Sequence, residues 1–327
     1  MKREGVFILF IYIVLTGFRI GENPQTEISN GIIKASLYLP DANNGYYRAT
    51  RFDWAGIISS LEYNGHNYFG KWFEKYRPTL HDAIMGPVDS FEPLNYDETK
   101  QGGSFVKIGV GTLTKLSDTL YKAFTTYPII DPGTWKIERE AAKIQFQHIL
   151  NHKDYPYEYT KIIEFVEGKP EMRISYRLKN KGKQRIETHV FNHNFFVFDH
   201  QVVGKGFELT FPENIVCSAK GRGIGDIAEV NENKLKIMRS LAKGESVYCG
   251  SLEGINNNSN DYDIKIDCYK TGAGVRIKGN QPISKLVFWC NDKTICPEPY
   301  INIDIEPGEE FSWETTYEFY IRDETDK

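Results

Sequence analysis

The chain has no concentrated block of basic residues and no closely spaced pair of cysteines. Its 40 lysines and arginines are scattered among 44 acidic residues, and the formal net charge is −4. Proteins that bind the phosphate backbone need a concentrated positive surface, so the composition argues against a nucleic-acid partner. The cysteines lack the C-x-x-C spacing of structural zinc sites, so we expect no metal site. Their odd number leaves at least one thiol unpaired within a monomer, and at most one or two disulfides form if the protein is exported. The five are Cys217, Cys249, Cys268, Cys290 and Cys296.

A long apolar run of the kind that crosses a bilayer is not apparent either. The run from Val6 to Leu15 follows Lys2 and Arg3 and is too short to span a membrane comfortably. A basic start followed by a short apolar stretch is typical of a signal peptide, which we place at residues 1–22. A buried first strand is the alternative interpretation. We expect the protein to be exported to the periplasm or secreted, with no membrane contact beyond this leader.

Long helical patterns are absent, and past residue 25 the dominant hydrophobic period is two. In the segment around Met172, Ile174, Tyr176 and Leu178, apolar residues alternate with polar ones, as in a half-buried strand. Many such segments joined by short polar turns predict an all-β protein, a large antiparallel β-sandwich with few short helices. Further strands are expected at residues 57–63, 105–114, 135–140, 143–150, 157–166, 185–196, 262–270, 283–290 and 311–322.

No linker divides the chain, so we expect one domain over residues 23–327. The short polar segments 167–170 and 180–183 are interpreted as hairpin connections between consecutive strands. The polar stretch 254–261 is interpreted as a surface loop, with a domain boundary as the alternative. Residues 77–100 contain Pro78, Pro87 and Pro93 and form the longest stretch without strand character. Long loops on a rigid sandwich often carry binding residues.

Two short motifs carry the groups best suited to acid–base chemistry. The first is Asn192-His193-Asn194-Phe195-Phe196, and the second is Cys296-Pro297-Glu298-Pro299-Tyr300. An imidazole titrates near neutral pH, and a carboxylate on a separate strand supplies a complementary group. Such a pair can move two protons on one substrate, one at each end of a breaking bond.

Together these motifs resemble those of the aldose 1-epimerase family, the galactose mutarotases. That family carries an Asn-His-x-Tyr-Phe-Asn-Leu strand and, later, a Glu in a Cys-x-Glu-x-Gln context followed by Pro-Gly and an aromatic-rich final strand. Here the later elements are matched by Pro307-Gly308 and by Tyr317-Glu318-Phe319. The resemblance implies a galactose mutarotase-like β-supersandwich that interconverts the α and β anomers of a monosaccharide or related carbohydrate without a cofactor.

Carried over residue by residue, the resemblance assigns roles to four residues. Glu298 resembles the general base that takes the proton of the anomeric hydroxyl, and His193 resembles the acid that protonates the ring oxygen. His81, in Thr79-Leu80-His81-Asp82, and Arg51 resemble residues that bind the sugar. Phe195 replaces the tyrosine of the family motif and Tyr300 stands where a glutamine usually lies, so the identity of the sugar stays open.

Other interpretations remain alongside the enzyme. A carbohydrate-binding protein of the same fold would keep the cleft without turnover. Polysaccharide lyases and glycoside hydrolases share this sandwich but normally add an α-helical domain, and the chain has no helical block of that size. Each candidate also has a structural interpretation: His193 as a hydrogen-bonded core residue, Glu298, Arg51 and His81 as surface residues. Trp54, Trp72 and Trp135 are candidates for sugar stacking or for the core. The oligomeric state is not predicted.

Overall fold

Strands account for nearly all regular structure in the computed structural model, which describes residues 23–218, 221–255 and 258–322. The expected signal peptide at residues 1–22 lies outside the described residues. In the described part of the chain the one helix is a single 3₁₀ turn, η1 (Ser259–Asp261). None of the described segments forms a helix of the length and apolarity needed to cross a membrane. The all-β prediction is therefore confirmed.

The largest layer is a ten-stranded antiparallel sheet. Its strands lie in the order β16 (Ala228–Asn231), β17 (Lys234–Ile237), β14 (Phe207–Thr210), β20 (Asp263–Cys268), β21 (Ala273–Gly279), β24 (Glu310–Ile321), β12 (Glu171–Asn180), β11 (Tyr157–Phe165), β10 (Lys143–Leu150) and β9 (Thr134–Arg139). The alternation that predicted a strand around Ile174 is confirmed, since Met172, Ile174, Tyr176 and Leu178 on β12 are all buried.

A five-stranded antiparallel sheet carries both chemical motifs. Its order is β18 (Ser246–Cys249), β22 (Lys285–Asn291), β23 (Ile295–Ile305), β13 (Ile186–Phe195) and β5 (Gly86–Phe91). Three smaller sheets complete the fold: β1 (Gln25–Ser29), β2 (Ile33–Tyr38), β3 (Ile57–Tyr63) and β4 (His66–Asn67); β6 (Ser104–Lys107), β7 (Gly111–Thr114) and β8 (Ile129–Asp131); and β15 (Val216–Cys217) with β19 (Leu252–Glu253).

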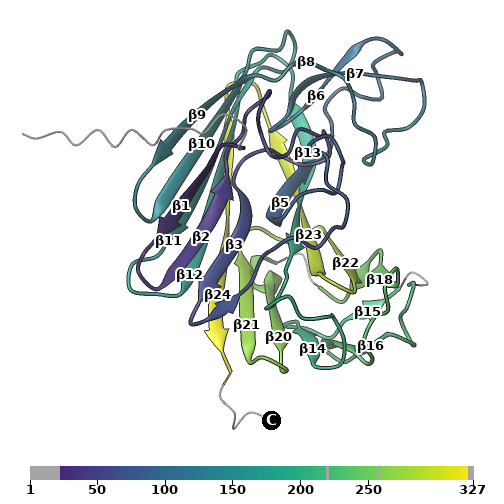
Figure 1. The fold of residues 1–327 in the computed structure, drawn as a ribbon. Coiled ribbons are helices and arrows are strands. Elements are labelled where there is room, and N and C mark those ends of the chain that lie inside the picture. The colour runs from purple at the N-terminus through teal and green to yellow at the C-terminus, as the bar shows by residue number, and fades with distance from the viewer. Residues whose placement is uncertain (1–22, 219–220, 256–257, 323–327) are drawn as a thin grey trace, which may run out of the picture.

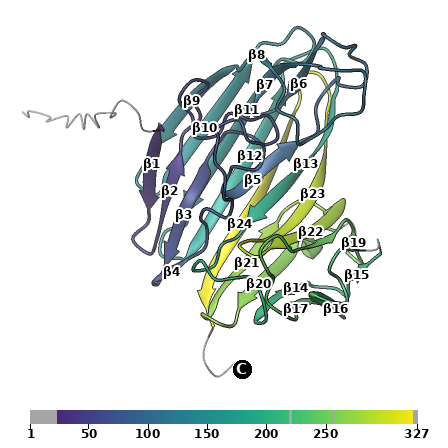
Figure 2. The same cartoon turned by 45° about the vertical axis from the view of Figure 1, so that its right-hand side comes forward.

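The sheets pack face to face around two hydrophobic cores. The larger core joins the ten-stranded sheet to the four-stranded and five-stranded sheets, which lie against it in Figures 1 and 2. The second core covers the opposite face of the five-stranded sheet and is rich in aromatic residues, among them Phe52, Trp54, Trp72 and Phe195. Trp54 is 1% exposed and Trp72 9%, so both belong to this core. The five-stranded sheet is thus covered on one face and, on the other face, over the part that carries Val88, Phe195 and Cys296.

Two predicted segments differ from the structure. Residues 105–114 form two strands, β6 and β7, rather than one, because Gly109 and Gly111 adopt φ angles of 75° and 137° that turn the chain between them. The stretch 77–100, which was predicted to lack strand character, contains β5. Pro87 is tolerated because β5 is the edge strand of its sheet, where one side of the backbone has no ladder partner.

The connection at residues 180–183 is not a hairpin, and this correction matters for the site. β12 pairs with β11 and β24 in the ten-stranded sheet, whereas β13 pairs with β23 and β5 in the five-stranded sheet. Asn180 anchors the crossing, since its side-chain amide donates to the backbone oxygens of Gln184 and Ile305 at 2.8 and 3.1 Å. A polar turn looks the same in sequence whether the next strand stays in its sheet or leaves it.

The cysteines form one disulfide, between Cys217 and Cys249, whose Cα atoms lie 6.0 Å apart. The remaining three, Cys268, Cys290 and Cys296, are buried free thiols. Burial raises the pKa of the Cys290 thiol to about 12, so it stays protonated. One disulfide lies within the range that the sequence predicted for an exported chain.

Candidate functional site

His193 and Glu298 meet because their strands, β13 and β23, are neighbours in the five-stranded sheet. Phe191 pairs with Tyr300 in the antiparallel register, so two residues further along His193 stands across from Glu298. The side-chain Nε2 of His193 lies 3.3 Å from Oε1 of Glu298. Only 4% of the His193 side chain and 8% of the Glu298 side chain are exposed. The structure therefore brings the two predicted proton-transfer groups into direct contact.

The His193 imidazole is enclosed by aromatic rings. It stacks on Phe195 with ring centroids 3.8 Å apart, and the rings of Phe52 and Trp289 approach its edges at 5.7 and 5.9 Å. Burial, together with the positive charge of Arg51, holds the pKa of His193 well below its usual value. Its Nδ1 is buried and has no hydrogen-bond partner among the described residues. At neutral pH the isolated imidazole is therefore uncharged.

The Glu298 carboxyl is shifted in the opposite direction. Burial raises its pKa to about 7, with the positive charge of Arg51 opposing the rise and the negative charge of Asp82 adding to it. A carboxyl group with a pKa near neutrality can both accept and release a proton under ordinary conditions. The same withdrawal from water thus favours the neutral form of both members of the pair.

Arg51 and His81 meet at Asp82, close to the pair. Arg51 forms an ion pair with the Asp82 carboxylate, and Nδ1 of His81 lies 3.0 Å from the other carboxylate oxygen. The guanidinium also lies 4.5 Å from the ring centroid of Phe124, and the His81 ring lies 5.2 Å from the same ring. Arg51 influences the pKa of both His193 and Glu298, so the structure places all four predicted residues in one region.

Phe124 and Asp82 were not predicted as site residues. Phe124 lies in the connection between β7 and β8, and 62% of its surface is exposed although it contacts Arg51 and His81. Asp82 directly follows His81 and organises both basic side chains. The adjacency of Asp82 to His81 was a usable signal, whereas an isolated aromatic residue in a polar loop offered none.

Behind the pair, the asparagines on either side of His193 point the other way, as alternation along a strand requires. The hydroxyl oxygen of Tyr317 lies 2.8 and 2.9 Å from the side-chain oxygens of Asn192 and Asn194, which share its one hydrogen. The Asn194 amide in turn donates to the backbone oxygen of Pro297 at 3.0 Å. The bond to Pro297 ties β13 to β23 directly beside His193 and Glu298, and the Tyr317 bonds tie β13 to β24 of the ten-stranded sheet.

The Asn192 amide also reaches a fully buried group of charges. It donates to Asp89 at 3.0 Å, and the other oxygen of Asp89 lies 2.8 Å from Nζ of Lys161. Asp53 lies 3.4 Å from the same Nζ and accepts a hydrogen bond from Tyr159 at 2.9 Å. On β11, Lys161 occupies the inward-facing position between Tyr159 and Ile163. Its place in this alternation indicates a buried lysine.

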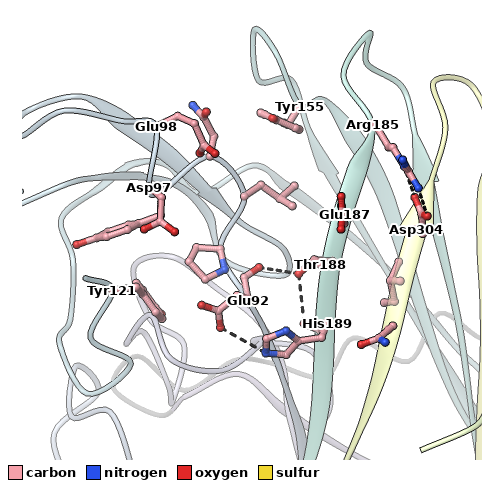
Figure 3. A pocket seen from close by; sticks show the side chains of 16 residues that line it. Glu92, Asp97, Glu98, Tyr121, Tyr155, Arg185, Glu187, Thr188, His189 and Asp304 are labelled. Carbon is pink, nitrogen blue, oxygen red and sulfur yellow. Dashed lines mark hydrogen bonds and ion pairs between the residues drawn. The ribbon is translucent and has the colours of Figure 1, made fainter. Parts of the chain in front are cut away.

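A cavity of about 690 Å³ opens on the same two strands as the pair, on the part of β13 and β23 nearer Arg185 and Asp304 (Figure 3). His193 and Glu298 do not line it. Its walls carry tyrosines Tyr96, Tyr121 and Tyr155 and five carboxylates, Glu92, Asp97, Glu98, Glu187 and Asp304.

The fold is shared with solved structures of sugar-epimerase relatives. The chain superposes on an aldose epimerase homologue from C. elegans with a TM-score of 0.55 and 12% identity, covering 92% of this chain and 100% of that one. A galactose mutarotase-like protein from Lactobacillus casei gives 0.53 and 14%, with 90% and 100% covered. A galactose mutarotase related enzyme from Lactobacillus acidophilus gives 0.51 and 12%, with 92% and 98% covered.

Comparison by sequence gives no counterpart to this structural likeness. No protein-family model matches the chain, and no curated protein matches it in sequence. Identities of 12–14% establish the fold alone. The chain therefore has the galactose mutarotase-like fold that its motifs predicted.

Proposed function

We propose that this chain is an aldose 1-epimerase, which interconverts the α and β anomers of a sugar by opening and reclosing its ring. The observation that carries the proposal is the 3.3 Å contact between His193 and Glu298. An imidazole and a carboxyl group this close, both largely withdrawn from water, can each transfer a proton on one hemiacetal. The fold adds support without fixing the activity, because one fold hosts many functions.

The pKa directions suggest how many protons the pair holds. The pKa of His193 is lowered well below its usual value and that of Glu298 is raised to about 7. Between these two pKa values the pair holds one proton in total. That is the state the reaction needs, since one group is then an acid and the other a base.

In the reactive arrangement the single proton has moved from Glu298 to His193 across their 3.3 Å contact, so that His193 is charged and Glu298 is ionised. Glu298 takes the proton of the anomeric hydroxyl while His193 gives its proton to the ring oxygen. The bond between C1 and the ring oxygen breaks, C1 becomes an aldehyde carbon, and the pair is left with its proton on Glu298. Rotation about the C1–C2 bond presents the other face of the aldehyde. Closure by the reverse transfers yields the opposite anomer and returns the proton to His193, so each turnover conserves protons and consumes no cofactor.

Arg51 and His81 are the proposed sugar-binding residues. The Nε of Arg51 is buried without a hydrogen-bond partner among the described residues, so it is a donor for a sugar hydroxyl. The ring of Phe124, with 62% of the residue exposed, offers an apolar surface beside them. Sugar rings present both hydroxyl groups and apolar C–H faces. The Arg51 donor can bind a hydroxyl group, and the Phe124 ring can pack against an apolar face.

A second candidate function, sugar binding without turnover, is favoured by the near-complete burial of the pair. With only 4% and 8% of their side chains exposed, His193 and Glu298 offer little surface to a substrate. Polarimetry or NMR with freshly dissolved α anomers of galactose, glucose and related aldoses separates the two. We expect the protein to accelerate the approach to anomeric equilibrium. Calorimetric binding of an aldose whose interconversion stays at the uncatalysed rate would support the second candidate instead.

The one-proton state also predicts the pH dependence. The free pair loses its proton as the pH rises through the pKa of Glu298, about 7. Since kcat/KM reports the free enzyme, we expect it to be highest below pH 7 and to fall by about tenfold per pH unit above it. The measurement is the polarimetric rate corrected for the uncatalysed reaction at each pH. If kcat/KM instead rises through pH 7 to a plateau, ionised Glu298 works without a protonated partner. That result would contradict the proposal that the pair must hold one proton.

A further inference from the structure

The cavity lies on the same row of side chains as His193 and Glu298, further along β13 and β23. Alternate residues of a strand share a face, so His189 and Glu187, which precede His193 on β13, lie on the same side of the sheet as His193. On β23, Asn302 and Asp304 follow Glu298 and share its face in the same way. The register pairs His189 with Asn302 and Glu187 with Asp304, and all four line the cavity. At about 3.3 Å per residue, the cavity begins about 13 Å from the pair.

An aromatic floor connects the two places. Between the pair and the cavity, Phe191 and Tyr300 are cross-strand partners whose rings stack with centroids 4.6 Å apart. Both residues are half-buried, and Nζ of Lys285 lies 5.3 Å from the centroid of the Tyr300 ring. The order along the sheet is therefore an acid–base pair, an aromatic surface and then a polar cavity. A chain of sugar rings, which have apolar faces and hydroxyl groups at their edges, matches this order of surfaces.

The charges of the cavity restrict what it can hold. Arg185 pairs with Asp304, and His189 lies 3.6 Å from Glu92. The other carboxylates, Asp97, Glu98 and Glu187, form no ion pair within the described part of the chain. Figure 3 shows Glu187 and Thr188 on one wall and Asp97 and Glu98 across from them. Carboxylates accept hydrogen bonds from hydroxyl groups and repel phosphates and acidic sugars.

We propose that the cavity binds the further sugar residues of a neutral reducing oligosaccharide whose terminal ring lies at His193 and Glu298. The inference rests on the proposed function and names its substrate class. A volume of about 690 Å³ is within the range of pockets that enclose a small-molecule ligand. The glycan would then lie along β13 and β23, with its reducing end at the pair.

The test compares monosaccharides with neutral trisaccharides. Anomer interconversion is measured for glucose, galactose, maltotriose, cellotriose and β-1,4-galactotriose. We expect kcat/KM for at least one trisaccharide to exceed that of its own monosaccharide by roughly tenfold, the gain that one or two added hydrogen bonds supply. The double variant Glu187→Gln/Asn302→Ala should remove that advantage and leave the monosaccharide rates unchanged. Both residues are exposed, so the fold should tolerate the changes. Glu229→Gln, at an exposed position on β16, is the matched control.

Failure of this inference and failure of the proposed function give different results. The alditols of the three trisaccharides have no anomeric centre, and their binding is measured by calorimetry. Alditol binding that the double variant abolishes, without anomer interconversion of any sugar, would reject the epimerase and keep the glycan site. Interconversion of monosaccharides with no trisaccharide advantage and no alditol binding would keep the epimerase and overturn the glycan site. Equal losses for mono- and trisaccharides in the double variant would also overturn it.

Discussion

Replacing Glu298 with glutamine is expected to lower kcat for anomer interconversion by roughly 10²- to 10⁴-fold, the usual contribution of a positioned acid or base. Glutamine has the size and hydrogen-bonding capacity of the protonated carboxyl but cannot exchange a proton with His193 or with the anomeric hydroxyl. Since burial already favours the neutral form of Glu298, the variant should fold normally and keep its affinity for sugar. Polarimetry measures the rate, and calorimetry with the same aldose measures binding.

The control for this prediction is Glu229→Gln, the same chemical change at an exposed position on β16. It should leave both rate and affinity unchanged. His193→Gln should resemble Glu298→Gln, because the proposed reaction uses both groups in every turnover. Wild-type rates in Glu298→Gln would reject Glu298 as the proton acceptor and with it the proposed mechanism.

Replacing Lys161 with methionine is expected to lower the free energy of unfolding by about 3–5 kcal/mol, the usual cost of breaking a buried ion pair from one side. Lys161 is fully buried between Asp53 and Asp89, at 3.4 and 2.8 Å, and methionine fills similar space without the charge. Two carboxylates would then face each other in the core without a cation. Denaturant unfolding followed by tryptophan fluorescence measures the change.

Two comparisons separate the buried charge from a general effect of losing a lysine. Lys278→Met removes a partner of Glu318 from a half-exposed ion pair of 3.1 Å, and should cost at most about 1 kcal/mol. Adding Asp53→Asn and Asp89→Asn to Lys161→Met removes the uncompensated charges and should recover much of the stability. The loss in Lys161→Met alone should also shrink at acid pH, because burial raises the pKa of Asp53 to about 6 and protonation of Asp53 then removes one of the uncompensated charges. A loss no larger than that of Lys278→Met would contradict a charged buried cluster.

Local patterns were sufficient to predict the fold class and to single out the two side chains that are proposed to react. The two-residue period placed eleven of the 24 strands in the described part of the chain, including β3 and β10 with their observed bounds, and missed β23, which carries Glu298. The motifs around His193 and Glu298 singled out an imidazole and a carboxyl group. Their contact depends on the register between β13 and β23, which joins residues far apart in the chain and leaves no mark in either segment alone. Only the family resemblance indicated that the two would meet.

Other parts of the site depend on contacts that no local pattern encodes. The carboxylates of the cavity come from the segment after β5, from β13 and from β23, and each is an ordinary polar residue within its own segment. The buried cluster is a partial exception, because Lys161 occupies an inward position of β11 between Tyr159 and Ile163. Its partners Asp53 and Asp89 lie in a loop and in a proline-containing strand, where alternation says nothing about burial.

Because the chain crosses between sheets from β12 to β13, the crossing limits which truncated fragments can contain both His193 and Glu298. β13 lies in the five-stranded sheet, and its partner β23 is synthesised only after the intervening strands. The hydrogen bond of Asn194 therefore reaches a residue 103 positions away. No truncated fragment that ends before β23 or starts after β13 contains the acid–base pair. Complementation between two separately expressed pieces would have to rebuild the central ladder of the five-stranded sheet, and a library of truncations should therefore show activity as an all-or-none property of the chain.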